Sequence, residues 1–225
     1  MLEHIFIIPD GNGRWAKQNK KSLINSYTSA TEKCIDTAHY LIERKGIKYV
    51  TFCPLSVRNL KRKGVEFLLT AFRPFAEERF KSSFSLSLAE STETKVQFIG
   101  DYEKYFPAWL NRVLGEVESK AEKNQKHTLT LLLAYDARAE IVNAAKKLLV
   151  ENVDPTSLDE EVFGSFLPTA GLPPIDLYLT TAGLTRCHTD WMAHQAYFHV
   201  SEKLWPDFTE EDLEEAIKAY ERRQF

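Results

Sequence analysis

Short hydrophobic runs alternate along this chain with longer segments in which hydrophobic residues recur at helical spacing. The runs are typical of buried strands, and the longer segments are typical of amphipathic helices. The predicted strands are His4–Pro9, Lys48–Leu55, Lys95–Ile99, Thr128–Tyr135 and Ile175–Leu179. The predicted helices are Ser26–Arg44, Val65–Ser82, Trp109–Lys123, Ala137–Val150, Leu158–Phe166 and Glu210–Arg222, with a further helix starting after Arg14.

This alternation predicts the fold class. It is typical of α/β proteins with a central, mostly parallel sheet, right-handed crossovers and helices on both faces. With 225 residues, of which 44% are hydrophobic, the chain can bury one sizeable core. It has no internal repeat, long linker or low-complexity tract, so we expect one domain over residues 1–225. The polar stretch Ser82–Thr94 is expected to be a mobile loop.

Charge and cysteine content narrow the class of protein further. The formal net charge is −3, which argues against a nucleic-acid-binding surface. No hydrophobic stretch approaches the roughly 20 residues of a membrane-spanning helix, and the N-terminus lacks the features of a signal peptide. Cys34, Cys53 and Cys187 are widely separated and form no CxxC motif. We therefore expect a reduced, cytoplasmic protein without a zinc site.

The segment Asp10-Gly11-Asn12-Gly13-Arg14 carries the strongest functional signal. It follows the first predicted strand and precedes a helix, which is where ligands bind in open α/β sheets. Its glycines allow close backbone approach, free N–H groups at a helix start attract phosphate, and Asp10 and Arg14 suit Mg²⁺ and phosphate respectively. From spacing alone, an Asn-Gly turn with Asp10 as N-cap remains an equally good interpretation.

Six segments, in order, make the chain resemble the cis-prenyltransferase family, of the undecaprenyl diphosphate synthase type. They are HIFIIPDGNGRWAK at the start, the S-x-x-N-x-x-R pattern of Ser56–Arg62, VQFIGD at Val96–Asp101, LTLLLAYDARAEIVNAAKKL, FLPTAGLPPIDLYLTTAG, and LWPDFTEEDL at Leu204–Leu213. The resemblance covers nearly the whole chain. It implies one α/β domain with an elongated hydrophobic tunnel, commonly a homodimer, and Mg²⁺-assisted ionisation of an allylic diphosphate that isopentenyl diphosphate then attacks.

The resemblance also implies roles for individual residues. Asp10 would hold Mg²⁺ and assist departure of diphosphate, and Ser56 and Asn59 would lie beside the reacting carbons. The residues implied in substrate binding are Gly11, Asn12, Gly13, Arg14 and Trp15 for the allylic diphosphate, Arg62 by the reaction centre, Arg186 for isopentenyl diphosphate, and Leu68, Leu69, Phe72 and Phe75 along the tunnel. His188 is a further candidate on its own chemistry, as a base or a diphosphate donor near neutral pH. The four tunnel residues also fit an ordinary core, and His188 also fits an exposed loop.

Several positions depart from the family's pattern. Leu23 and Tyr27 stand where relatives carry an Arg and a His that contact the first diphosphate. In the second site, Thr180 replaces an arginine, His188 a serine, and His199 a metal-binding glutamate, so His199 is a candidate metal ligand. A three-histidine zinc site of His188, His194 and His199 has no common spacing and is disfavoured.

From these departures we expect that the chain retains the binding site for the leaving diphosphate. We expect the site for isopentenyl diphosphate to have lost several of its binding residues. We therefore expect a prenyltransferase whose acceptor is isopentenyl diphosphate by resemblance, or instead a second allylic diphosphate, water, a non-isoprenoid nucleophile or the substrate's own double bond. A non-catalytic partner subunit and a phosphate-binding regulatory module are the alternatives. The first is disfavoured because such helper subunits tend to lose the first motif, which this chain keeps.

Overall fold

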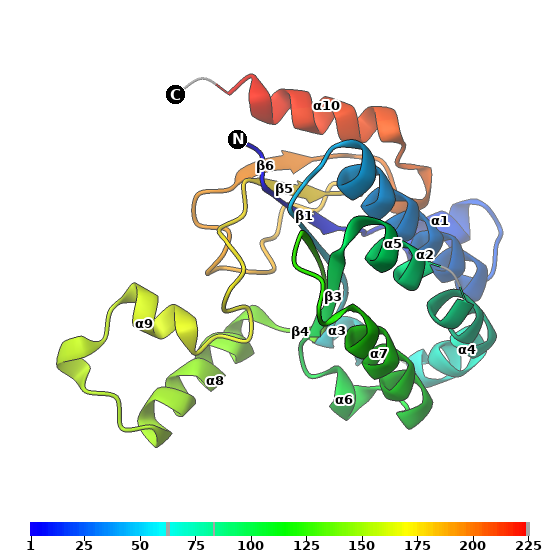
Figure 1. Cartoon of the computed structure of the whole chain (residues 1–225). Helices are drawn as coiled ribbons and strands as arrows, with labels where there is room; N and C mark the ends of the chain where they lie inside the picture. Colours follow the sequence, from blue (N-terminus) through cyan, green and yellow to red (C-terminus); the bar gives the residue numbers. More distant parts are fainter. Residues whose placement is uncertain (62–63, 83, 224–225) are drawn as a thin grey trace.

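The computed structural model describes residues 1–61, 64–82 and 84–223. Its centre is a parallel sheet of six strands in the order β3-β4-β2-β1-β5-β6 (Figure 1). The strands are β1 (His4–Ile8), β2 (Tyr49–Ser56), β3 (Thr94–Ile99), β4 (His127–Tyr135), β5 (Leu177–Thr180) and β6 (Tyr197–Val200). Because all pairs are parallel, every strand ends at the same edge of the sheet, as the α/β prediction requires.

Strand β1 has a continuous hydrophobic sequence because both of its faces are buried. All five residues of β1 are buried. Ile5 and Ile7 join the core on one face of the sheet, whereas Phe6 and Ile8 join the core on the other. A parallel strand covered on both faces needs apolar residues at every position, because successive side chains point to opposite faces.

The helices are α1 (Asn12–Gln18), α2 (Leu23–His39), α3 (Val57–Leu60), α4 (Val65–Ser82), α5 (Phe84–Thr92), α6 (Tyr102–Tyr105), α7 (Ala108–Ala121), α8 (Ala137–Val150), α9 (Glu160–Ser165) and α10 (Glu210–Glu221). Helices α2, α4, α5, α7 and α10 contribute to the larger core on one face. The other face is covered mainly by irregular segments within residues 172–196, while α8 and α9 project outward as a hairpin (Figure 1). Helices therefore cover one face of the sheet, whereas mainly irregular segments cover the other.

The structure corrects one expectation for local structure and adds a strand that was not expected. The Ser82–Thr94 stretch is not a loop, because α5 occupies most of it and buries Leu88 and Ala89. Its apolar positions are hidden among Ser and Glu in the sequence, so composition alone gave the wrong answer. Strand β6 was not predicted, since its residues alternate between half-buried and exposed and form no apolar run. In the described part of the chain, no helix is both long and apolar enough to cross a membrane.

Candidate active site

The loop between β1 and α1 forms one wall of the site. Its backbone turns at Gly11, which has φ of +101° and is the N-cap of α1, so Asp10 is not the N-cap. A Cβ at Gly11 would lie 2.9 Å from both the Ala182 Cβ and the Leu204 Cδ2. Glycine is therefore required here both for the left-handed backbone and for close packing against the next loop.

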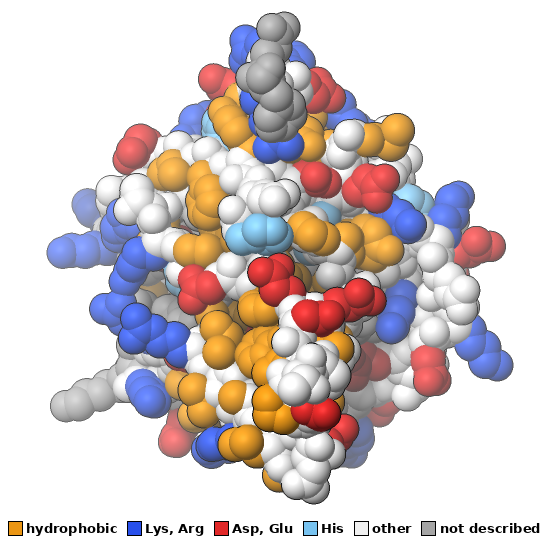
Figure 2. Space-filling model, turned by 90° about the vertical axis from the view of Figure 1, so that its left-hand side faces the viewer, with side chains coloured by type: hydrophobic (Ala, Val, Ile, Leu, Met, Phe, Trp, Pro, Cys, Tyr) orange, Lys and Arg blue, Asp and Glu red, His pale blue; other side chains and the backbone are white. Residues whose placement is uncertain are grey.

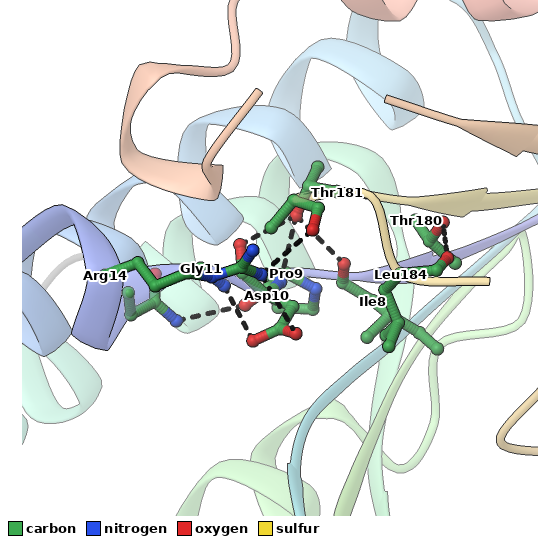
Figure 3. Close-up of polar contacts among 10 residues, drawn as sticks. Ile8, Pro9, Asp10, Gly11, Arg14, Thr180, Thr181 and Leu184 are labelled. Atoms are coloured by element: carbon green, nitrogen blue, oxygen red, sulfur yellow. Dashed lines mark hydrogen bonds and ion pairs between the residues drawn. The ribbon is translucent and has the colours of Figure 1, made fainter. Parts of the chain in front are cut away.

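Asp10 directs its carboxylate to the open side of this loop. Its Oδ1 accepts a hydrogen bond of 2.7 Å from the backbone N–H of Gly11, and its Oδ2 lies 3.7 Å from the Arg14 Nη2. The side chain is 45% exposed, so its outer lone pairs remain accessible to a cation. Arg14 also donates to the Ala182 carbonyl at 2.9 Å, which fixes the guanidinium beside Asp10 (Figure 3).

The end of β2 supplies a second wall. Ser56 is the N-cap of the short helix α3, and it forms a capping box with Asn59. The Ser56 hydroxyl donates to the Asn59 Oδ1 at 2.5 Å, and the Asn59 backbone N–H lies 3.4 Å from the Ser56 Oγ. This local bonding orders the polar pair that the S-x-x-N pattern predicted as part of the site.

The loop after β5 forms the third wall. Thr181 is fully buried, and its hydroxyl lies 2.9 Å from both the backbone N–H and the carbonyl of Asp10 (Figure 3). Thr180 is also buried, and its hydroxyl donates to the Leu184 carbonyl. Both threonine hydroxyls are therefore engaged by backbone, and the loop is joined to the Asp10 loop.

These three walls enclose a polar pocket of about 130 Å³. Seven of the expected site residues line it, namely Asp10, Asn12, Gly13, Ser56, Asn59, Arg186 and His188. Asn12 donates its Nδ2 to the Pro9 carbonyl, while its Oδ1 is buried without a partner in the described structure. A donor group of a bound ligand or a water molecule could pair with this oxygen.

An apolar cavity of about 170 Å³ adjoins the polar pocket. The two share the lining residues Tyr27, Pro54, Leu55 and Asn59. Leu68, Leu69 and Phe72 of α4 line the apolar cavity as expected, together with residues of α2, α7, β3 and β4. Phe75 is not among its lining residues and instead packs on Phe72, with ring centroids 4.9 Å apart.

His188 lines the polar pocket, and the pKa of its imidazole is shifted. Burial lowers the pKa of its imidazole below the ordinary value, and the neighbouring Arg186 lowers it further, whereas the Arg186 carbonyl and Asp10 raise it. The Arg186 carbonyl lies 3.2 Å from the His188 Nδ1. A lowered pKa favours the neutral form of the ring near neutral pH, and a bound anion would favour the charged form.

The donor set of the pocket fits Mg²⁺ held together with a substrate. The described residues contain no cluster of three or more His, Cys, Asp or Glu side chains that could hold a metal ion. Mg²⁺ is commonly bound by one or two carboxylates together with substrate phosphates and water. The accessible carboxylate of Asp10 suits that arrangement.

Gly11, Arg14, Trp15 and His199, which were also expected in the site, line neither cavity. Gly11 packs against Leu204, Arg14 lies beside Asp10, and the Trp15 Nε1 donates to the Asp207 Oδ1 at 2.7 Å. His199 lies on β6 beside Leu179, and its pKa is lowered by burial and raised by Glu215 of α10. Because paired residues in a parallel ladder share a face, the structure places His199 toward the α10 side, away from Asp10.

Sequence analysis missed Arg58 as a site residue, and it named Tyr27 only as the replacement of a histidine. Arg58 lines the polar pocket from the first turn of α3, and Tyr27 lines both cavities from α2. The usable signal for Arg58 was an arginine placed between Ser56 and Asn59, directly after a strand end. Arg62, the other arginine of that segment, lies outside the described residues.

Comparison with known proteins agrees with this geometry. A family model described as putative undecaprenyl diphosphate synthase matches residues 8–225. The chain is 34% identical to a tritrans,polycis-undecaprenyl-diphosphate synthase (geranylgeranyl-diphosphate specific) of Pyrobaculum aerophilum, over 98% of this chain and 93% of the relative. It is 31% identical to an isoprenyl transferase of Aquifex aeolicus, over 99% and 94% of the two chains.

The solved structures give the same result. A crystal structure of lavandulyl diphosphate synthase from Lavandula x intermedia, in complex with dimethylallyl diphosphate, superposes with a TM-score of 0.86 at 28% identity, covering 99% of this chain and 96% of that one. A probable undecaprenyl diphosphate synthase from Campylobacter jejuni, 21% identical, shares the fold with a TM-score of 0.75, covering 100% and 97% of the two chains. The chain thus belongs to the undecaprenyl diphosphate synthase family of prenyltransferases.

Proposed function

We propose that this protein ionises an allylic prenyl diphosphate and couples the prenyl group to an acceptor. The observation that carries this proposal is the junction of two cavities of opposite character. The polar pocket offers Asp10, Asn12 and Gly13 to a diphosphate, and the apolar cavity beside it offers Leu68 and Phe72 to a hydrocarbon chain. A prenyl diphosphate has these two parts joined at the carbon that reacts.

The residues of the first loop act mainly on the leaving group. In the reaction, the C1–O bond of the donor breaks and its electron pair leaves with diphosphate. Arg14 and the backbone N–H groups at the start of α1 stabilise the charge that develops there. The apolar cavity excludes water from the cationic prenyl fragment, and Ser56 and Asn59 lie where the cavity meets the pocket.

Magnesium is the cofactor proposed for this step. Asp10 would hold it, together with oxygens of the donor diphosphate, and the ion would supply charge neutralisation of the leaving group. We also propose His199 as a metal ligand, because it stands at the position of the family's metal-binding glutamate. Its place on β6, paired with Leu179, gives this proposal no further support.

The acceptor supplies the electrons of the bond that forms to the prenyl group. When the acceptor is an alkene, its π electrons form the new C–C bond and a proton is lost to water. By resemblance, the acceptor is isopentenyl diphosphate. A second allylic diphosphate is the other candidate, because Thr180 leaves no arginine at that place in the second loop, and because a structurally similar protein is named lavandulyl diphosphate synthase and was solved with dimethylallyl diphosphate.

We also propose a homodimer that works in the cytoplasm. Hydrophobic side chains gather on the face from which α8 and α9 project (Figure 2). Phe198 and Val200 are 46% and 38% exposed on β6, which is an edge strand, and Leu149 and Val150 are exposed on α8. A second copy of the chain would cover this surface. The three free cysteines suit a reducing compartment.

Product analysis tests the proposed activity. The purified protein is incubated with Mg²⁺ and dimethylallyl, geranyl or geranylgeranyl diphosphate, with and without isopentenyl diphosphate, and the products are identified by mass spectrometry. We expect prenyl-coupled products that disappear when Mg²⁺ is chelated. Absence of product and of released diphosphate from every donor would overturn the activity and favour a non-catalytic subunit.

A further inference from the structure

A buried tyrosine lies beneath the loop that brings His188 to the polar pocket. Tyr178 is the second residue of β5 and is fully buried. Its side chain belongs to the core that also contains Phe6 of β1 and Leu184 of the loop after β5. A phenol at a buried strand position needs a hydrogen-bond partner for its hydroxyl, so the partner shows what this tyrosine holds.

That partner is the backbone of the pocket loop. The His188 backbone N–H donates to the Tyr178 Oη at 2.7 Å. The side chains of His188 and Arg186 both line the polar pocket, and the Arg186 carbonyl lies 3.2 Å from the His188 Nδ1. The phenol therefore ties the loop to β5 at the place where two pocket-lining side chains leave the backbone.

A row of three aromatic rings fixes the direction of the phenol. Phe6 of β1, Tyr178 of β5 and Phe198 of β6 are register partners on neighbouring strands. The Tyr178 ring stacks on Phe6 with centroids 4.7 Å apart and on Phe198 with centroids 4.5 Å apart. Because the ring is held between two others, its hydroxyl cannot turn away from the loop without disturbing both stacks.

The loop depends on such contacts over this stretch. Within the described part of the chain, residues 181–196 form no helix or strand, and residues 185–187 are exposed. A second phenol, that of Tyr135, lies 3.4 Å from the Thr189 Oγ1, which is a longer contact than the bond from His188 to Tyr178. Shorter hydrogen bonds are the stronger ones, so Tyr178 is the firmer of these two phenol anchors.

The phenol is also an acceptor of constant charge. Burial raises the pKa of Tyr178 above its ordinary value, and Cys187 and Cys53 raise it further, whereas the hydrogen bond from His188 lowers it. The phenol therefore stays neutral over the pH range in which an imidazole titrates. A change in the titration of His188 then reports on the position of the loop and not on ionisation of the tyrosine.

We infer that Tyr178 is a positioning residue of the pocket, whose hydroxyl holds the loop after β5 so that His188 and Arg186 face the polar pocket. This inference rests on the proposed function of that pocket and adds a residue that does not itself touch the substrate. Tyr178→Phe keeps the three stacked rings, but the His188 N–H loses its acceptor, so the exposed loop is released toward solvent.

Amide hydrogen exchange and imidazole titration, both followed by NMR, test the inference without turnover. In the wild-type protein, the His188 amide should exchange more slowly than those of its exposed neighbours Arg186 and Cys187. In Tyr178→Phe, this protection should be lost, and the pKa of His188 should rise toward 6.5 because its ring becomes less buried. Inorganic diphosphate, titrated calorimetrically with Mg²⁺, should bind about 2- to 10-fold more weakly, as expected for one hydrogen bond.

Tyr40→Phe is the matched control. Tyr40 directly follows α2, and its hydroxyl donates to the Glu214 carboxylate at 2.6 Å, outside both cavity linings. This variant should lower the thermal midpoint but change neither the protection of the His188 amide, nor the His188 pKa, nor diphosphate affinity.

Two results would overturn the inference. One is a wild-type His188 amide that exchanges as fast as its neighbours, which is measured without any variant. The other is a folded Tyr178→Phe protein with the wild-type His188 pKa and diphosphate affinity. Whether the wild-type protein binds diphosphate and forms product decides the proposed function, whereas hydrogen exchange and the His188 pKa decide this inference.

Discussion

The loops that follow β1 and β5 lie side by side, but the polar side chains of the first face the pocket and those at the start of the second bind backbone. In the β1 loop, the Asp10 carboxylate and Gly13 border the pocket. In the β5 loop, the hydroxyls of Thr180 and Thr181 are bound to backbone carbonyls and are buried. The first loop is thus open to a ligand, whereas the beginning of the second is built into the scaffold that supports it.

This difference shows that the second loop supports the first through its buried threonine and its backbone. Thr181 holds the Asp10 backbone, and the carbonyl of Ala182 anchors Arg14. Among the described residues of the second loop, Arg186 is the first cationic side chain that lines the pocket. The largest catalytic effects should therefore arise from the first loop, and effects on folding should arise from Thr180 and Thr181.

Replacing Asp10 tests the first half of this comparison and should have the largest effect. Asp10→Asn removes the charge that we propose holds Mg²⁺ but keeps the shape of the side chain. We expect kcat to fall by roughly 100- to 1,000-fold, the range seen when one transition-state contact is lost. The rate is measured as released diphosphate. Asp36→Asn, on the exposed side of α2, is the control and should keep the wild-type rate. Equal rates in both variants would remove Asp10 from the mechanism.

The sequence predicted the first loop well, because its motif is local and follows a strongly apolar strand. Asp10 and Arg14 are four residues apart across the turn at Gly11, so their short separation in the sequence keeps them close in space. The second loop was predicted less well. Whether Thr180 faces the pocket or the core depends on the carbonyl of Leu184, and the presence of Arg58 and Arg186 in one pocket lining depends on the order of β2, β1 and β5. Such tertiary relations are not encoded in spacing.

Restoring the arginine of the family pattern tests whether the β5 loop still has room for an anion site. Thr180→Arg would place a charged side chain where the present one is 1% exposed. We expect a loss of about 3–5 kcal/mol in the free energy of unfolding, as for an unpaired buried charge, and a fall of roughly 6–20 °C in the thermal midpoint. If the variant keeps the wild-type midpoint and binds the acceptor more tightly, the loop is an open site and the comparison fails.

Thr181→Val tests the support that one loop gives to the other. Valine has the shape of threonine but cannot bond the backbone N–H and carbonyl of Asp10, each 2.9 Å from the hydroxyl. We expect a loss of about 1–3 kcal/mol in stability, and also a lower kcat, because the Asp10 loop is less firmly held. Thr180→Val is the matched control, since it removes a hydroxyl that bonds only within its own loop. It should lose stability without a change in kcat.

The smallest effect concerns His188 and the pH dependence of folding. Its pKa in the folded protein lies below the ordinary value of 6.5, so the unfolded chain binds a proton more readily. The contribution of His188 to stability should therefore decrease as the pH falls from about 6.5 toward the folded pKa and should change no further below it.

His188→Gln removes this contribution, so its thermal midpoint should fall less than that of the wild type between pH 7.5 and 5.5. Inorganic diphosphate should shrink the difference at pH 5.5, because an anion in the pocket favours the charged imidazole. A midpoint difference that is the same in both proteins, with and without diphosphate, would show that the second loop contributes no titrating group to the site.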